Sequence, residues 1–273
     1  MRFSTSQYTI LISQYTIIMK KIAKFLYNVA AWTYAAISAP ILMIIALLIF
    51  CIAYPFDPKR KALHIFSGFW GLQYFWMNPL WRIRYSGKEN IDKHKTYIIV
   101  SNHQSYLDIC AMYKLPLVFK WVSKIEATKI PFIGWLLPMH GDVLIKRGEG
   151  KSSREMMTKC AHWIKLGASI SIFPEGTRSA NGQIHRFKEG AFLLARVNKL
   201  PILPVVMDGT CDMFPKKGLA LGGRATLQIK VLPEISAETV ASMSAKELSE
   251  YLHDMMLTEH KKMVPHRYTG VEE

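Results

Sequence analysis

The feature that most constrains how this chain folds is a long apolar run near its N-terminus. Residues Phe25 to Phe56 include no charged side chain. A helix needs roughly 20 apolar residues to cross the hydrocarbon core of a bilayer, and this run is longer. It is also too long for the apolar part of a signal peptide and lacks a convincing small-residue cleavage site. The run therefore predicts a segment in contact with lipid.

Pro40 and the flanking charges indicate how this segment is arranged. Pro40 lies inside the run, where it removes a backbone donor and can bend a helix into two halves. Basic residues favour the cytoplasmic face of a membrane. They flank both ends of the run: Lys20, Lys21 and Lys24 before it, and Lys59, Arg60 and Lys61 after it. This pattern predicts a membrane-embedded helical hairpin that enters and leaves on the same side, with a single span as the alternative.

The neighbouring residues extend the predicted membrane-binding segment to residues 19–83. The stretch from Ala62 to Trp81 is uncharged apart from His64 and is rich in aromatic side chains, which suit the interface between membrane and water. A helix hairpin buried in a soluble core is the alternative. Residues 1–18 contain the sequence Ser-Gln-Tyr-Thr-Ile twice and are predicted to be an extension or a wrongly assigned start.

The charge balance of the 273-residue chain limits the partners it can have. The formal net charge is +15 and the pI is near 9.6. This excess predicts an anionic partner, either an anionic membrane surface or an acidic carrier protein, unless the charge is only a solvated surface. Nucleic acid is not expected as a partner, because no recognition motif is present. The four cysteines show no metal-ligand spacing, which indicates a reducing compartment and no metal site.

Beyond residue 83 the chain alternates short apolar runs with helical patterns. Two of the helical patterns begin with a capping box, Ser152 with Glu155 and Ser244 with Glu247. Strands that alternate with helices predict an α/β fold for residues 84–273, with a mostly parallel sheet flanked by helices. The predicted strands are Thr96–Val100, Leu117–Val122, Val143–Ile145, Ser169–Phe173, Ile202–Met207 and Ala225–Leu232.

A histidine and an aspartate follow directly on the first predicted strand. Functional groups in an α/β sheet collect just past the carboxyl ends of strands, and Asn102 to Asp108 lie at such an end. Four residues separate His103 from Asp108, so one tight turn can bring the carboxylate to the imidazole. There it fixes the tautomer and stabilises the ring when it takes a proton. His103 is therefore a candidate general base. Taken alone, the same spacing also fits an ordinary structural histidine.

A second polar block follows another predicted strand. It reads Phe-Pro-Glu-Gly-Thr-Arg-Ser, from Phe173 to Ser179. Gly176 lets a ligand approach the backbone closely, and Arg178 offers a planar guanidinium that matches phosphate. Thr177 adds a hydroxyl donor, while Glu175 either holds Arg178 or hydrogen-bonds a substrate hydroxyl. An ordinary surface turn with a salt bridge is the alternative.

Together these blocks resemble the 1-acyl-sn-glycerol-3-phosphate acyltransferases, a family of glycerolipid acyltransferases with an HxxxxD motif. The resemblance runs from about Tyr97 to Leu232, and four ordered blocks are far more specific than any one alone. Asp142 departs from the family, which usually has an uncharged residue at that position. The four blocks are His103 to Asp108, Gly141 to Arg147, Phe173 to Ser179 and Ile202 to Val206.

The resemblance implies an enzyme that moves a fatty acyl group from acyl-ACP or acyl-CoA to the sn-2 hydroxyl of lysophosphatidic acid, giving phosphatidic acid. His103 is then expected to deprotonate the hydroxyl, which attacks the thioester directly, and Asp108 to orient His103. Arg147 and Arg178 are expected to clamp the phosphate of the acceptor beside Gly176. No cofactor or metal is implied. The expected location is the cytoplasmic face of the inner (cell) membrane, with the protein integral or monotopic.

Three other functions fit the same residues. A related acyltransferase acts on another acceptor, such as glycerol 3-phosphate, a lyso-ornithine lipid or another lysophospholipid. A thioesterase uses His103 to activate water and releases free fatty acid without an acceptor. A catalytically silent membrane-interaction protein keeps the fold but tolerates changes at His103.

Overall fold

The computed structural model describes residues 5–146 and 150–269, without the side chains of residues 5–12 and 150–153. Its contacts divide the chain into two compact units, Met1–Leu42 and Met43–Glu273. The boundary falls inside the first helix, so the larger unit contains the end of that helix and everything that follows it.

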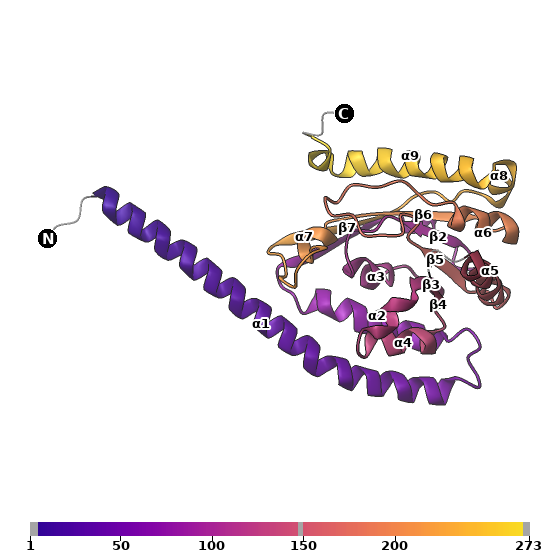
Figure 1. Ribbon diagram of the computed structural model, residues 1–273, viewed down its shortest axis with the longest axis horizontal. Helices are drawn as coiled ribbons and strands as arrows, with labels where there is room; N and C mark the ends of the chain where they lie inside the picture. The colour runs from indigo at the N-terminus through magenta and orange to yellow at the C-terminus, as the bar shows by residue number, and fades with distance from the viewer. Residues whose placement is uncertain (1–4, 147–149, 270–273) are drawn as a thin grey trace. The chain divides into compact units, whose positions relative to one another are not determined.

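The first helix, α1, spans Thr5–Ala53 and continues through Pro40 without a break (Figure 1). The prediction that Pro40 divides the apolar run into a hairpin of two half-helices is therefore wrong. Proline removes one backbone hydrogen bond, and the strong helix formers around it, such as alanine and leucine, maintain the others. By length and composition, Ser13–Ala53 is sufficiently long and apolar to cross a membrane, which indicates membrane association.

The second helix, α2, spans Lys61–Trp76 and has one buried and one exposed face. Trp70 and Phe75 are buried, and the helix contacts α3 in the larger unit. Phe69 and Trp76 are about half exposed, at 49% and 57%. The aromatic stretch therefore contributes to the protein core, and only its outer face is available to a membrane interface.

A seven-stranded sheet forms the centre of the larger unit, with the strand order β1-β7-β6-β2-β5-β3-β4. Neighbouring strands pair in parallel except β6 and β7, which are antiparallel. This confirms the predicted mostly parallel sheet. The sequence does not predict β1, because Arg82 and Arg84 interrupt its apolar residues. The strands are β1 Trp81–Ser86, β2 Ile98–Ser101, β3 Phe119–Lys124, β4 Val143–Ile145, β5 Ser169–Ile172, β6 Ile202–Asp208 and β7 Ala225–Val231.

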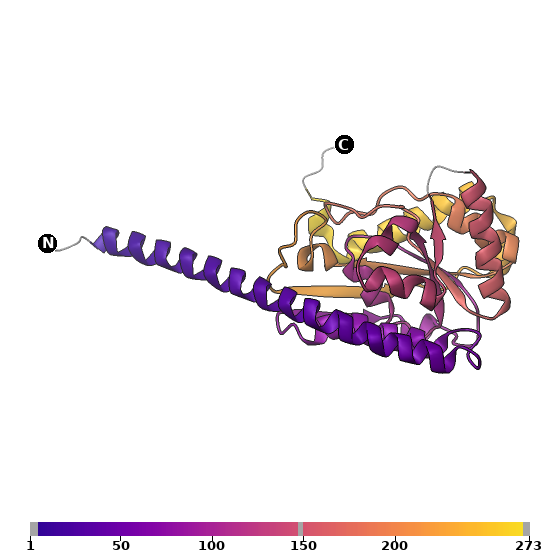
Figure 2. The ribbon, with the colours of Figure 1, turned by 60° about the horizontal axis from the view of Figure 1, so that its bottom comes forward.

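Helices cover both faces of the sheet (Figures 1 and 2). The core on one face is formed with α5, α6, α8 and α9, and the core on the other with α2 and α3. In β2, Ile98 and Val100 belong to the first core and Ile99 to the second, as the alternation of a strand requires. The remaining helices are α3 Leu107–Met112, α4 Ile133–His140, α5 Gly150–Lys165, α6 Gly190–Asn198, α7 Thr210–Met213, α8 Ala237–Ser242 and α9 Ala245–Met263, with short 3₁₀ turns η1 Lys88–Asn90, η2 Ile125–Lys129 and η3 Pro265–Arg267.

The two predicted capping boxes have different outcomes. The Ser244 hydroxyl accepts from the backbone N–H of Glu247, whose carboxylate accepts from the N–H of Ser244, so the box at the start of α9 is confirmed. α5 begins at Gly150. The side chain of Ser152 lies outside the described part of the chain, so the box predicted there stays a prediction.

Candidate active site

Three neighbouring strands end at one edge of the sheet, and polar residues lie at each end. β2 pairs in parallel with both β5 and β6, so their carboxyl ends meet. His103 follows β2, Glu175 follows β5, and Asp208 ends β6. The two polar blocks contact each other directly: the N–H of His103 donates to Glu175 Oε1 at 2.9 Å, and the N–H of Ser179 donates to the His103 carbonyl at 2.7 Å.

Asp108 is fully buried in the first turn of α3, and its carboxylate is held from several sides. Its Oδ2 atom lies 2.8 Å from His103 Nδ1, and it accepts from the backbone N–H groups of Gln104 and Ser105 at 2.6 and 2.8 Å. Its Oδ1 atom accepts from the hydroxyl of Thr210. A carboxylate fixed in this way places the imidazole proton on Nδ1 and leaves Nε2 to accept a proton. This is the geometry that a general base requires.

Aromatic rings hold the imidazole from one side. The His103 ring lies parallel to the ring of Phe173, with centroids 4.0 Å apart and planes inclined by 6°. Phe173 in turn stacks on Trp121 at 5.2 Å. The His103 side chain remains 13% exposed, so the stack restricts the ring without closing it off. The sequence gives no sign of this role for Phe173 or Trp121, because stacking between residues distant in sequence has no local signal.

Glu175 is a buried carboxyl group with an unusual environment. It is 5% exposed, and its Oε2 atom has no hydrogen-bond partner among the described residues. Burial raises the pKa of Glu175 to about 8, although the N–H groups of His103 and His185 oppose this shift. Glu175 is therefore mostly protonated at neutral pH. It can offer the proton on Oε2 to a ligand while Oε1 holds the His103 backbone.

Replacing Glu175 with glutamine is expected to change the pH dependence of stability. In the wild type the pKa of Glu175 in the folded protein lies above its pKa in the unfolded chain. The contribution of Glu175 to the free energy of unfolding is therefore fully present below about pH 4.5 and is lost as the pH rises to about 8. The loss is at most about 1.4 kcal/mol per pH unit. Glu175→Gln removes it, so the variant gains stability relative to wild type between pH 5 and 8. Thermal unfolding across this range measures the effect, with Glu189→Gln, an exposed position, as control. Parallel curves for wild type and Glu175→Gln contradict the assignment.

Among the described residues, Arg178 contacts an aromatic ring rather than a carboxylate. Its guanidinium carbon lies 3.9 Å from the centroid of the Tyr106 ring. Among the described residues no ion pair joins it to Glu175, whose Oε1 atom accepts from the His103 backbone instead. Gly176 has a positive φ of 73°, which favours glycine at this turn, and Thr177 is exposed. Arg147 lies outside the described residues.

Asp142, the departure from the family pattern, belongs to a buried polar network. Its Oδ1 atom accepts from the backbone N–H of Trp121 at 2.9 Å and lies 2.7 Å from His140 Nδ1. His140 Nε2 lies 3.1 Å from His64 Nδ1, and the buried Lys120 donates to the His140 carbonyl. Burial lowers the pKa of both histidines and that of Lys120, the last to about 8. Asp142 thus anchors the strand that carries Trp121.

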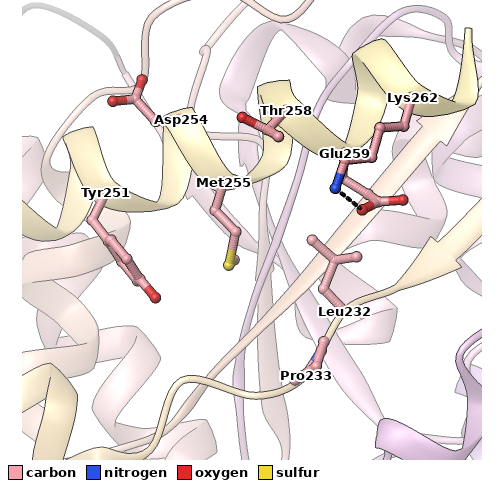
Figure 3. A pocket seen from close by; sticks show the side chains of 8 residues that line it. All are labelled: Leu232, Pro233, Tyr251, Asp254, Met255, Thr258, Glu259 and Lys262. Atoms are coloured by element: carbon pink, nitrogen blue, oxygen red, sulfur yellow. Dashed lines mark ion pairs between the residues drawn. The ribbon is translucent and has the colours of Figure 1, made fainter.

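A groove of about 420 Å³ lies along α9, on a different part of the larger unit (Figure 3). No candidate site residue of the described chain lines it, and it contains no histidine that can act as a base. Lys262 and Glu259 form a long ion pair of 3.8 Å on its rim (Figure 3). The groove is lined by Leu232, Pro233, Tyr251, Asp254, Met255, Thr258, Glu259 and Lys262. The candidate chemistry therefore lies at the strand ends and not in this groove.

Comparisons with known proteins agree with the geometry. Residues 82–208 match the family model described as Acyltransferase. Over 183 residues the chain is 36% identical to the chloroplastic 1-acyl-sn-glycerol-3-phosphate acyltransferase LPAT1 of Arabidopsis thaliana. The aligned residues make up 66% of this chain and 51% of that protein. Over 189 residues it is 32% identical to the 1-acyl-sn-glycerol-3-phosphate acyltransferase of Saccharomyces cerevisiae, covering 66% and 60%. The chain thus spans about half to three-fifths of the length of these relatives.

A solved structure shares the fold. The crystal structure of the 1-acyl-sn-glycerophosphate (LPA) acyltransferase PlsC from Thermotoga maritima matches with a TM-score of 0.74 at 23% identity, over 93% of this chain and 99% of that chain. All four sequence blocks lie within the matched residues 82–208. The predicted family is thus confirmed: the chain belongs to the acyltransferase family that includes the 1-acyl-sn-glycerol-3-phosphate acyltransferases.

Proposed function

We propose that this protein transfers a fatty acyl group from a thioester donor, acyl-ACP or acyl-CoA, to the sn-2 hydroxyl of lysophosphatidic acid, giving phosphatidic acid. The observation that carries the proposal is the 2.8 Å contact between His103 Nδ1 and the buried Asp108 carboxylate at the end of β2. The relatives named above, with the same printed activity over two-thirds of this chain, support the choice of reaction.

The reaction follows from the position of the base. His103 Nε2 takes the proton of the acceptor hydroxyl as its oxygen attacks the thioester carbonyl carbon. The imidazolium that forms is stabilised by the Asp108 carboxylate on Nδ1. When the tetrahedral intermediate collapses, the C–S bond breaks and the imidazolium returns the proton to the leaving thiolate. The hydroxyl attacks directly, so no enzyme nucleophile is needed.

The polar block after β5 is the proposed site for the acceptor. Arg178 and Arg147 are proposed to bind its phosphate, since guanidinium groups pair with phosphate oxygens in a bidentate manner. Gly176 lets the headgroup approach the backbone, and Thr177 adds a donor. Glu175 Oε2, a buried oxygen that lacks a described partner, is proposed to hydrogen-bond the acceptor near the reacting hydroxyl.

An acyl-transfer assay with a panel of acceptors tests the proposal. Full-length protein in membranes is supplied with radiolabelled acyl-CoA or acyl-ACP and with lysophosphatidic acid, glycerol 3-phosphate, lysophosphatidylcholine or no acceptor. Phosphatidic acid formed from lysophosphatidic acid in clear preference to the other products supports the proposal. Transfer mainly to another acceptor identifies that acceptor as the substrate instead of lysophosphatidic acid. Free fatty acid released without an acceptor indicates a thioesterase.

We further propose that residues 19–83 bind the cytoplasmic face of the cell membrane and residues 84–273 carry the catalytic site. The anionic membrane surface and the anionic donor account for the net charge of +15. Nucleic acid has no part in this proposal.

Removing Met1–Leu42 is expected to release the protein from membranes. A chain that begins at Met43 keeps only a short end of α1, Met43 to Ala53, and this is far below the roughly 20 residues that span a bilayer. Full-length protein should stay with membranes after an alkaline wash, whereas the shortened chain should appear in the supernatant. A chain beginning at Met19 keeps the apolar run and serves as control. Retention of the Met43 chain after the wash assigns membrane binding to the larger unit instead.

A further inference from the structure

We infer that Arg267 is a positioning residue for the catalytic pair: it holds the end of β6 and two loops in the arrangement that aligns His103 with Asp108. The inference rests on the proposed function. Arg267 lies in η3, beyond the matched residues 82–208, and the sequence motifs give no sign of its involvement.

The first link joins Arg267 to Asp208 at the end of β6. The guanidinium donates through Nε to Asp208 Oδ1 and through Nη2 to Asp208 Oδ2 at 3.0 Å, and the side chain is only 9% exposed. Burial alone raises the pKa of Asp208, but hydrogen bonds from His260, Arg267 and Gln104 more than offset this and lower it to about 2. The pair is therefore charged at all working pH values, and its bidentate geometry fixes the carboxylate.

The second link runs from Asp208 to the catalytic loop. Gln104 follows His103 directly and is fully buried. Its Nε2 atom donates to Asp208 Oδ1 at 2.9 Å, and its Oε1 atom accepts from the N–H of Gly209 at 3.2 Å. The next residue, Thr210, donates its hydroxyl to Asp108. The end of β6 thus touches the loop beside His103 and the carboxylate that orients it.

The third link reaches the loop that follows the Arg178 block. The backbone carbonyl of Arg267 accepts from Gln183 Nε2, and the Tyr268 hydroxyl accepts from the N–H of Ile184 at 3.3 Å. Gln104 Nε2 also donates to the carbonyl of Gly182 at 2.7 Å. A Cβ atom added at Gly182 would lie only 2.8 Å from an Arg267 nitrogen, so the arginine packs closely against this loop. The Arg267 side chain therefore holds Asp208 beside the first loop and packs against the second loop at Gly182, while its backbone carbonyl and Tyr268 hydrogen-bond the second loop.

The test compares Arg267→Gln with Arg267→Lys in full-length protein. No described contact joins the Arg267 side chain to Glu175, Gly176, Thr177 or Arg178 of the proposed acceptor site. Arg267→Gln is therefore expected to lower kcat by about 10- to 100-fold, as a displacement of about 1 Å can, and to change the KM for acceptor and for donor by less than about threefold. The pH profile of kcat/KM, which reports on the groups that transfer protons, should also shift, because the contact between the base and the Asp108 carboxylate is displaced. Arg267→Lys restores one charged donor and is expected to recover part of the rate.

Two controls separate positioning from folding. Lys262→Gln removes another C-terminal cation, on the rim of the α9 groove (Figure 3), and should leave kcat unchanged. The folded fraction of each variant is measured at every pH by thermal unfolding, and the rate is expressed per mole of folded protein. A rate loss with an unmoved pH profile then overturns the inference, as does a wild-type rate. If Arg267→Gln does not fold, Gln104→Leu breaks the same link from the catalytic loop and should give the same shift. The variants are compared with wild-type protein that is active in the acyl-transfer assay. If the wild type transfers no acyl group to any acceptor, that result contradicts the proposed function and not the role of Arg267.

Discussion

Replacing His103 with alanine is expected to lower the rate of acyl transfer by about 10²- to 10⁴-fold, the usual loss when a general base is removed. The acceptor hydroxyl then has no group at Nε2 to take its proton as it attacks the thioester. Asp108 cannot take over this role, because it is fully buried and its Oδ2 atom also accepts two backbone N–H groups. The measurement is acyl transfer at saturating donor and acceptor, per mole of purified protein.

The same variant should remain folded. Asp108 keeps its bonds to the backbone and to Thr210 when the imidazole is absent, and Phe173 still stacks on Trp121. His94→Ala is the matched control, since His94 is an exposed histidine near the same strand. Near-normal turnover by folded His103→Ala protein refutes the mechanism, and an equal loss in His94→Ala shows that the assay does not report on the site.

The sequence predicts the fold well where the pattern is local. Continuous apolar runs mark the buried strands on either side of β2, and their alternation with helices predicts the parallel sheet. The sequence does not predict β1, because Arg82 and Arg84 give this segment a polar pattern, although Trp81 is buried. The hairpin fails for a different reason. Pro40 has a strong preference to bend a helix, but whether a long apolar helix continues depends on all of its neighbours.

In the candidate site, too, contacts between residues close in sequence can be predicted and contacts between distant residues cannot. His103 and Asp108 are five positions apart, so their contact is set by one turn and is readable from spacing. Glu175 and Arg178 are only three positions apart, yet no described ion pair joins them. The Arg178 guanidinium lies over the Tyr106 ring, and the Glu175 carboxyl group accepts from the His103 backbone N–H. Such partners come from another strand end. No spacing rule predicts them.

Replacing Arg178 with alanine is expected to raise the KM for the acceptor far more than the KM for the donor. A lost charge-assisted hydrogen bond weakens binding by about 1.5–3 kcal/mol, which corresponds to about 10- to 150-fold in affinity. The guanidinium lies over the Tyr106 ring and has no carboxylate partner among the described residues, so its charge is available to a phosphate. Arg178→Lys keeps the charge but loses the planar fork, and an intermediate KM is expected. Kinetics with each substrate varied in turn measure the effect. An equal rise in both KM values instead assigns Arg178 a structural role, because a residue that binds only the acceptor phosphate has no reason to weaken the donor.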